Sequence, residues 1–429
     1  MLRLSERRRL ARTERQHRGW APLLIGALIA TGLFGCSSWT GRPRPLQIYV
    51  ETGEGGKGRL RADNIAESRT AAQAVSDSFR LAREDVELIF TFIEGSRFVD
   101  EVAYRTGLGL GPDLMMARVP TTRALLLAGL TNSEPVDGPW LKTVSPELRQ
   151  AVSQNGTPVM KPFVVFPQVA CVNRRLMPEP PATLAELLEQ AAGGKAVGLP
   201  SRFRDLAWTM NDPLMETFVR SGLKRGDPAL RQLATQQDIE PAFRTWLRWI
   251  GNAGLQNNVL FFRSTSDLDR AFRDKELSWI PCRGNSIRDH VLNLGQDLVI
   301  TPLPGRVEGE IPFAVTEQLM MSFGVNSTRQ QSERARDFAL FVLSRITQKQ
   351  LTRSIVGAFP VNTGMIFSAA SGRLQALQAS RNRSAFESLE AAAIQGERGE
   401  ALDDLVEEVS LGLMSPEEGA RAVSESLKQ

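Results

Sequence analysis

The stretch KPFVVFPQVACVN, from Lys161 to Asn173, decides how this chain is divided. Its run of valine, phenylalanine and alanine favours extended structure. Pro162 and Pro167 suit a segment that passes between two domains, because proline interrupts the hydrogen-bond ladder of a central strand. We therefore expect this segment to leave one lobe and to enter another.

On both sides of that segment, short apolar runs alternate with helical patterns. Gly53 to Gly58 is an expected loop, and Thr183 is an expected N-cap, with Gly193-Gly194 as the helix stop. The expected strands are 46–50, 86–93, 113–116, 196–200 and 298–303. One expected helix follows the Gly-rich loop and ends near 83, and the other expected helices cover 183–192, 332–345 and 415–427. This alternation predicts an α/β protein with largely parallel sheets.

The N-terminal segment has the pattern of a secretory signal. Seven arginines precede an apolar run at 20–34, which ends at Leu33-Phe34-Gly35-Cys36. A basic region, an apolar core of about 15 residues and a small residue before cysteine are typical of a bacterial lipoprotein signal. We expect residues 1–35 to be removed, Cys36 to carry the lipid, and 36–45 to form the tether. Phe34 is unusually bulky for this motif, so a secreted protein or an uncleaved anchor are the alternatives.

The length and the charge of the remaining chain describe an ordinary globular protein. The chain has 429 residues, and about 394 remain after the signal, which exceeds one typical hydrophobic core and predicts two lobes. Residues 1–35 hold 7 of the 52 basic and 2 of the 48 acidic residues, so the remainder has a net charge of −1. No basic arm is left that would indicate nucleic-acid binding.

Few residues in the sequence suit catalysis or metal binding. His290 is the one histidine after the signal, and no Cys/His or His/Glu cluster has metal-ligand spacing. Gly53 to Lys57 lacks the full phosphate-loop pattern, since Gly58 and Arg59 follow the lysine. Tyr49 and Tyr104 are too far apart for the adjacent tyrosines of ferric-iron receptors. We expect no enzyme, no cofactor and no metal.

The two further cysteines are Cys171 and Cys282. They could pair in an oxidising compartment, but sequence separation does not give their distance. We expect two separately buried thiols.

Several short motifs carry a family resemblance. In chain order they are Gly111–Met115, Gly156-Thr157-Pro158, Pro162-Phe163, Cys171–Leu176, Pro178–Leu188, Thr301–Gly305, Glu333–Phe341, Pro360-Val361-Asn362 and Leu413–Ala420. Their order and spacing behind a lipoprotein-like signal resemble the family 1 extracellular solute-binding proteins. These are lipid-anchored or periplasmic receptors of bacterial ABC importers for sugars.

The resemblance implies a periplasmic-binding-protein type II-like α/β fold, in which a multi-crossing hinge joins two lobes with the ligand cleft between them. The expected divisions are lobe I at 46–167 and 302–345, and lobe II at 168–301 and 346–429. The crossings are expected near Gln168, Thr301 and Ile346. The implied receptor is a monomer in the periplasm or at the cell surface, which meets ABC permease subunits and touches the membrane through its lipid alone.

Ligand-binding candidates follow from the positions of strand ends, where this fold places its ligand. They are Glu51, Glu54, Glu94, Ser96, Arg118, Gln168, Arg204, Trp208, Arg283 and Glu317. Glu317 is expected to begin a helix. For each of these residues the alternative is a solvated loop position.

One candidate departs from the family pattern. Related sequences often carry a stacking tryptophan where this chain has Arg283, while Trp279 falls in the preceding strand and is expected to be buried. A guanidinium can stack on a flat face or pair with an anion. The leading hypothesis is a receptor for a sugar or sugar-derived polyol. The alternatives are a receptor for a small anion such as a sugar acid or phosphorylated polyol, and a surface enzyme or structural lipoprotein.

Overall fold

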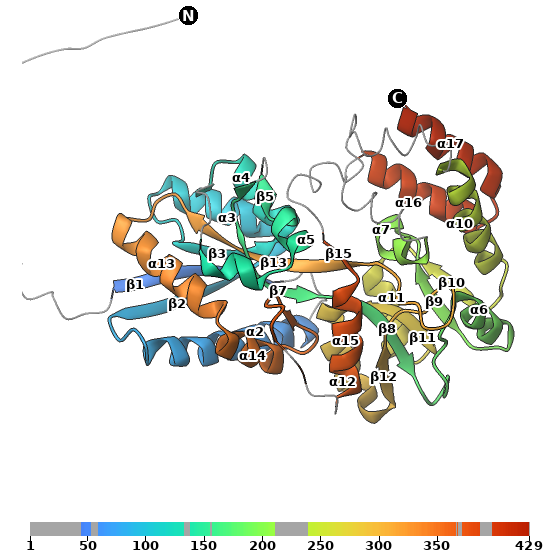
Figure 1. Ribbon diagram of the computed structural model, residues 1–429, viewed down its shortest axis with the longest axis horizontal. Helices are drawn as coiled ribbons and strands as arrows, with labels where there is room; N and C mark the ends of the chain where they lie inside the picture. Colours follow the sequence, from blue (N-terminus) through green and yellow to red (C-terminus); the bar gives the residue numbers. More distant parts are fainter. Residues whose placement is uncertain are drawn as a thin grey trace, which may run out of the picture. The chain divides into compact units, whose positions relative to one another are not determined.

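Two main sheets organise the computed structural model (Figure 1). It describes residues 44–52, 59–132, 138–154, 157–210, 239–365, 367, 371–386 and 397–428. Residues Pro45–Gln429 form one compact unit. The predicted signal, Cys36 and Glu54 lie outside the described residues.

The first sheet contains eight strands among the described residues. Six follow the order β14–β7–β13–β3–β1–β2, and β4 and β15 both pair with β13. Their bounds are β1 (Arg44–Thr52), β2 (Val86–Glu94), β3 (Leu114–Arg118), β4 (Thr131–Asn132), β7 (Lys161–Phe166), β13 (Ala314–Gly324), β14 (Phe359–Pro360) and β15 (Ser384–Phe386). The first three strands predicted from the sequence are therefore confirmed.

Helices cover both faces of this sheet. Ile48 and Leu114 enter the core beneath one face, whereas their neighbours Tyr49 and Met115 enter the core beneath the other. Successive side chains of a strand point to opposite faces, which explains why Ile48–Val50 of β1 and Leu114–Ala117 of β3 are apolar on both faces. The first face is covered by α2 (Arg59–Arg80), α13 (Arg329–Val342) and α14 (Arg345–Ser354), and the second by α3 (Gly95–Gly107) and α4 (Val119–Leu127).

The second sheet has five strands in the order β10–β9–β11–β8–β12. They are β8 (Gln168–Asn173), β9 (Val197–Pro200), β10 (Val259–Phe262), β11 (Trp279–Arg283) and β12 (Leu298–Thr301). The surrounding helices are α6 (Leu184–Ala192), α7 (Phe203–Leu206), α10 (Ile239–Gly254), α11 (Thr265–Arg273), α12 (Ile287–Leu294), α15 (Gly372–Asn382), α16 (Glu397–Ser410) and α17 (Pro416–Lys428). Thr183 caps α6 by accepting a hydrogen bond from the Glu186 amide, as predicted.

The remaining described elements are short. They are the pair β5 (Ser153–Gln154) and β6 (Thr157–Pro158), the helix α5 (Pro146–Ala151), and 3₁₀ turns at Pro139–Thr143, Ala207–Thr209, Gly284–Ser286 and Gly295–Asp297. The turn at Gly284–Ser286, labelled η3, directly follows β11.

The chain passes between the sheets at the predicted proline. Pro167 separates β7, which pairs with β13 and β14, from β8, which pairs with β11 and β12. A second passage joins β12 to β13 after Thr301. The third differs from the expectation near Ile346, because α14 and β14 still pack with the first sheet. The chain leaves this sheet after Pro360 and returns to it with β15, which pairs with β13.

Both sheets are mixed rather than largely parallel. β1 runs parallel to β3, but β13 runs antiparallel to β3 and β7, and β8 runs antiparallel to β11 and β12. The antiparallel partners are the strands that come from, or return to, the other lobe. They do not belong to a strand–helix–strand unit, so the rule that makes such units parallel does not act on them.

The expectation of two separate thiols is wrong. Cys171 and Cys282 form a disulfide with 5.7 Å between their Cα atoms. The antiparallel register places Cys171 opposite Ile280 and Cys282 opposite Val169, so the two cysteines lie on adjacent strands, two positions apart. The two cysteines are 111 residues apart in the chain, so the sequence alone does not show that they lie close together.

Removal of the disulfide should lower the free energy of unfolding by about 2–5 kcal/mol, because the bond closes a long loop in the unfolded chain. The variant Cys171→Ala/Cys282→Ala avoids burying new polar atoms. Urea unfolding with and without reductant measures the effect. Reductant should destabilise the wild type and leave the variant unchanged; an equal response of both proteins would contradict a bond that contributes to stability.

Candidate functional site

Glu51 and Arg118 form an ion pair at the ends of two neighbouring parallel strands of the first sheet. The Glu51 carboxylate is buried and accepts hydrogen bonds from the Arg118 backbone amide at 2.8 Å, from its Nε at 2.8 Å and from its Nη2 at 2.5 Å. Thr121 donates a further bond at 3.0 Å. A Cβ on Gly95 would collide with both charged groups, so this glycine makes room for the pair. A buried carboxylate is stable here because its oxygens are fully hydrogen-bonded.

Glu317 extends this group of charges toward the second sheet. It lies within β13, opposite Phe166 of β7, and does not begin a helix as we expected. Its carboxylate is 3.8 Å from Arg118 Nε and accepts a hydrogen bond from Asn285 Nδ2 at 2.9 Å. Because Asn285 follows β11, this bond joins elements of the two sheets.

Arg283 makes the corresponding ion pair in the second sheet. Its Nη2 donates to both oxygens of Asp205, at 2.5 and 2.6 Å, and its Nε donates to one of them at 3.1 Å. Asp205 is buried, whereas 35% of the Arg283 side chain is exposed. The Asp205 carboxylate, with a smaller contribution from Glu317, raises the pKa of Arg283 above its usual range, against the opposing effect of burial.

Gln168 completes this second group. It begins β8 directly after the crossover and lies opposite Arg283 in the register. Its amide nitrogen donates to the backbone oxygen of Asp205 at 2.8 Å. Its buried Oε1 has no hydrogen-bond partner among the described residues, which leaves one acceptor beside the Arg283–Asp205 pair.

The other predicted residues lie in different surroundings. Glu94 ends β2 and is half-buried, and Ser96 is exposed on the first turn of α3. Arg204 is half-buried on α7, next to Asp205. Trp208 is only 1% exposed and packs in the second core against Trp279, with 6.1 Å between ring centroids. The structure therefore gives Trp208 no free face for stacking on a ligand, and Trp279 is buried as predicted.

Sequence reasoning missed three residues that organise the site, namely Asp205, Asn285 and Thr121. Asp205 lies five positions after the end of β9 and is adjacent to the predicted residue Arg204. A buried carboxylate needs a charged or hydrogen-bonding partner. The position of this acidic residue soon after a strand was therefore the signal that could have identified Asp205 as a partner for a nearby arginine. Asn285 and Thr121 gave no comparable signal, because short polar residues are ordinary in turns and first helical turns.

Two glycines bring the backbones of the two lobes together near these charges. A Cβ on Gly357 would overlap the Gly284 carbonyl, and a Cβ on Gly284 would crowd the Phe166 backbone. Gly357 also has a φ of 87°, which side chains rarely adopt. The turn after β11 thus lies directly against the loop that precedes β14.

A partly buried ion pair accompanies this glycine contact. Glu67 of α2 accepts a hydrogen bond from the Val356 amide at 3.1 Å and lies 3.5 Å from Arg288 Nε of α12. Burial raises the pKa of Glu67, although Val356 and Arg288 oppose the shift and Asp289 adds to it. The folded protein therefore binds this proton more tightly than the unfolded chain, and stability falls as the pH rises through this interval.

The variant Glu67→Gln keeps an acceptor for Val356 but cannot titrate. Its free energy of unfolding, relative to wild type, should rise between pH 4 and the raised pKa, because only the wild type loses a proton there. Chemical unfolding at a series of pH values measures the difference. Glu333→Gln, at an exposed position on α13, is the matched control. A difference that is independent of pH, or that falls with pH, would contradict the burial argument.

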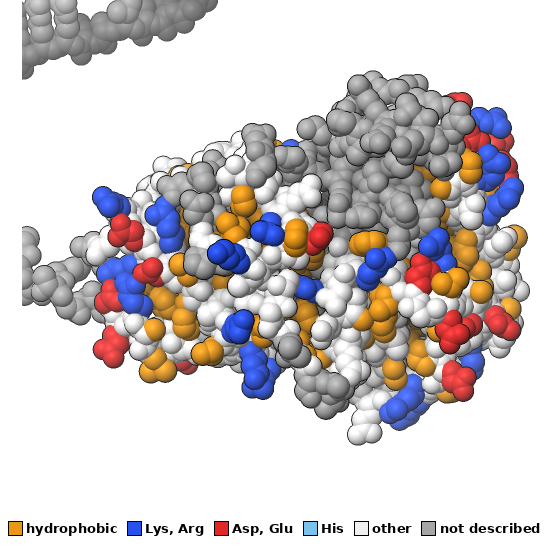
Figure 2. Space-filling model, in the orientation of Figure 1, with side chains coloured by type: hydrophobic (Ala, Val, Ile, Leu, Met, Phe, Trp, Pro, Cys, Tyr) orange, Lys and Arg blue, Asp and Glu red, His pale blue; other side chains and the backbone are white. Residues whose placement is uncertain are grey.

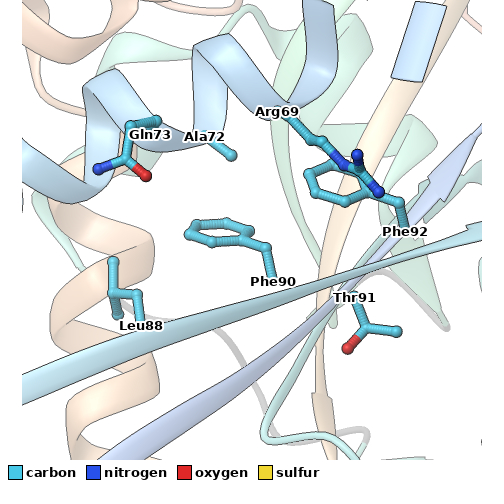
Figure 3. Close-up of a pocket in the computed structure, with 7 residues that line it drawn as sticks. All are labelled: Arg69, Ala72, Gln73, Leu88, Phe90, Thr91 and Phe92. Carbon is cyan, nitrogen blue, oxygen red and sulfur yellow. The ribbon is translucent and has the colours of Figure 1, made fainter. Parts of the chain in front are cut away.

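A separate pocket of about 540 Å³ lies between α2 and β2 (Figure 3). Phe90 and Phe92 extend from the strand toward the helix, and Arg69 lies over the Phe92 ring at 6.0 Å from its centroid. None of the predicted ligand-binding residues lines this pocket. It is therefore distinct from the polar residues at the strand ends.

The remaining features of the described residues concern His290, metal binding, membrane spans and the surface charges. His290 is fully buried, its Nε2 lies 2.9 Å from Asp269 Oδ1, and its ring packs edge-to-face on Phe272. In the described ranges, no group of three His, Cys, Asp or Glu residues is arranged to hold a metal ion. None of the helices described is long and apolar enough to cross a membrane. Basic and acidic side chains are interspersed on the face that Figure 2 shows.

Comparisons with solved structures match nearly the whole chain. The GacH receptor of Streptomyces glaucescens GLA.O, solved unliganded and with acarbose, is 16% identical with a TM-score of 0.64 over 89% of this chain and 97% of that one. A cyclo/maltodextrin-binding protein complexed with maltotetraose is 14% identical with a TM-score of 0.68, over 90% and 97%. An extracellular solute-binding protein from Staphylococcus aureus in complex with maltose is 14% identical with a TM-score of 0.65, over 90% and 98%.

The fold is that of an extracellular solute-binding protein. This confirms the predicted two-lobed α/β architecture and the structural resemblance that the sequence motifs indicated. No family model matches the sequence, and no curated protein matches it either. Within the solute-binding fold, the two ion pairs described above lie at strand ends of the two lobes.

Proposed function

We propose that this protein is the substrate-binding component of an ABC importer and that it binds a sugar or a sugar-derived polyol. The observation that carries the proposal is the polar group at the strand ends, in which Asn285 of one lobe reaches Glu317 of the other. Structural likeness to receptors solved with maltose, maltotetraose and acarbose supports the sugar. The receptor has no catalytic step in this proposal.

The proposed lobes follow the predicted boundaries with one change. Lobe I takes 46–167 and 302–345 together with 346–360, because β14 pairs with β7. Lobe II takes 168–301 and the rest of the C-terminal part, except β15, which pairs with β13 of the first sheet. Closure of the lobes would require motion at the Gly284–Gly357 contact and at the Asn285–Glu317 hydrogen bond. Hinge motions are absorbed by a few such residues.

The charges favour a neutral ligand over an anion. Arg118 and Arg283 are the cations of the site, and buried carboxylates already neutralise both of them. With Glu317 added, the five groups carry a net charge of −1. The partly exposed guanidinium faces can still stack on a sugar ring, and Glu317 and the Gln168 oxygen can accept hydrogen bonds from hydroxyls. A sugar acid would meet unfavourable charge.

A matched pair of ligands, a neutral sugar and its sugar acid, tests both the function and the charge argument. A thermal-shift screen identifies the sugar, since a ligand at 100 times its Kd should stabilise the protein by roughly 2.7 kcal/mol. Calorimetry should then show that Asp205→Asn improves the ratio of sugar-acid to sugar affinity by on the order of tenfold, because Arg283 regains an uncompensated charge.

The control for this experiment is Asp404→Asn, which removes an exposed carboxylate paired with Arg263 on the surface. It should leave both affinities unchanged. If no sugar in a broad panel stabilises the protein, the proposed function fails. If a sugar binds but the affinity ratio of Asp205→Asn equals that of wild type, the Arg283 pair lies outside the ligand site.

The location proposed for this receptor is the periplasm or the cell surface, with a lipid on Cys36 as its membrane anchor. The Cys171–Cys282 disulfide supports an oxidising compartment, since such bonds are rare in the cytosol. The proposed partners are ABC permease subunits and the small solute, and the proposed receptor is a monomer that binds no nucleic acid.

Cys36→Ser should move the protein from the membrane fraction to the soluble fraction if acylation at this residue holds it there, because stable anchoring takes two or more acyl chains. Fractionation and the mass of the N-terminal peptide measure the effect. Cys171→Ala/Cys282→Ala should remain in the membrane fraction and serves as the control for loss of a cysteine. A Cys36→Ser protein that stays membrane-bound would contradict lipid anchoring.

A further inference from the structure

The first sheet has two functionally different edges. β1 runs parallel to β3, with Ile48 opposite Leu114, so both strands end together at Glu51 and Arg118. At the opposite edge β1 extends four residues beyond the start of β3, and Asp113, just before β3, accepts a hydrogen bond from the Gln47 amide. From Arg44 to Glu51 the strand rises about 23 Å at roughly 3.3 Å per residue. The candidate ligand site is therefore at one edge of this sheet and the point where the tether joins β1 is at the other.

The edge at the start of β1 carries large exposed apolar side chains. Tyr104 is 63% exposed, Leu108 56%, Leu110 62% and Leu127 72%. We call these four residues the basal edge. Leu110 lies at this end of the sheet, as Arg44 does, because each lies four residues before a member of the Ile48–Leu114 pair. Leu127 lies at the same end of the sheet, because it precedes β4, whose Thr131 pairs with Gly324 at the end of β13. The side chains thus come from α3, α4 and the turn before β3 at one end of the sheet.

The basal edge is held rigidly. The Leu110 amide donates to the Arg105 carbonyl at 2.9 Å, and Gly109, with a φ of 72°, turns the chain between the two leucines. Asn326 donates to the Thr106 carbonyl at 3.1 Å, which ties the turn after β13 to the end of α3. Leucines on such a fixed turn lose little conformational entropy when a partner covers them.

The chain itself indicates what covers this edge. Arg44 lies eight positions after Cys36, and a fully extended chain of that length spans at most about 26–29 Å. This short segment includes Trp39, Arg42 and Arg44 and no acidic residue. Tryptophan and arginine are the residues that favour the interface between a bilayer and water. The start of β1 is thus confined within that distance of any membrane that holds residue 36.

We propose that the basal edge rests on the surface of the lipid bilayer, with Leu108, Leu110 and Leu127 inserted among the headgroups. This inference rests on the membrane-anchored location proposed above. A second exposed apolar group of equal size, Leu255, Leu411 and Leu413, occurs at the ends of α10 and α16 in the other lobe. No tether joins the chain there, so it serves as an internal control.

The test replaces residues 1–36 with a hexahistidine tag, which keeps the natural tether and does not depend on acylation. The protein is attached to vesicles of phosphatidylethanolamine and phosphatidylglycerol that contain a nickel-chelating lipid, and imidazole releases it. Hydrogen–deuterium exchange is measured in both states. Amide exchange in residues 104–111 should slow on the order of tenfold when the protein is attached and recover on release. Residues 408–414 should exchange equally in both states.

Two variants separate membrane contact from other causes. Leu108→Ser/Leu110→Ser should abolish the difference between attached and released protein, whereas Leu411→Ser/Leu413→Ser should preserve it. Equal exchange of 104–111 in the attached and released wild type would overturn the proposal. Protection that persists after release and grows with protein concentration would assign the edge to a second copy and would also overturn it. Sugar binding, measured separately by thermal shift, reports on the proposed function whatever the exchange shows.

Discussion

The continuous extended segment β7–Pro167–β8 is the constraint on which the rest of the structure depends. Its first half is hydrogen-bonded into one sheet and its second half into the other. Proline at the junction has no amide hydrogen to donate, so neither ladder can extend across it. The end of β7 and the start of β8 therefore stay within one residue of each other, and Glu317, opposite Phe166, and Arg283, opposite Gln168, are brought to the junction by register alone.

Paired charges follow from that arrangement. Strand ends supply Glu51, Arg118, Glu317 and Arg283, and each cation is matched to a carboxylate that is more buried than itself. A buried carboxylate is costly unless its oxygens are satisfied, whereas a guanidinium can present one face to solvent while bonding through its edge. The result is a site in which charge is compensated inside each lobe. Among these charged groups, Glu317 is the one that bonds across the junction, through the Asn285–Glu317 hydrogen bond.

The sequence predicted β1, β2 and β3 of the first sheet and β9 and β12 of the second, because buried strands are short apolar runs between turn residues. It did not predict β10 or β13. It predicted the crossover at Pro167 and the Thr183 cap, which depend on local chemistry. It failed where pairing decided the outcome. The direction of β13, the strand position of Glu317 and the Cys171–Cys282 bond all depend on which distant strand lies alongside, and no local pattern encodes this. Trp208 shows the same limit, since an aromatic residue after a strand can face a ligand or the core.

A receptor that opens and closes needs contacts between its lobes that are specific but weak, since a two-state element must be shifted by the binding energy of a small ligand. In the proposed receptor, the polar and backbone contacts at the junction are of this kind. A Cβ on Gly357 would overlap the Gly284 carbonyl, so two backbones lie against each other here with no side chain between them. The accompanying Glu67–Arg288 pair is partly exposed and at 3.5 Å is not tightly bonded. The strong bonds, Arg283–Asp205 and Arg118–Glu51, stay within single lobes and would move as rigid groups. In the proposed receptor, strong polar pairing inside each lobe would preserve the site's internal geometry during closure. One apolar cluster contains residues of both sheets, such as Val165 and Ile280, and its packing would have to adjust to the motion.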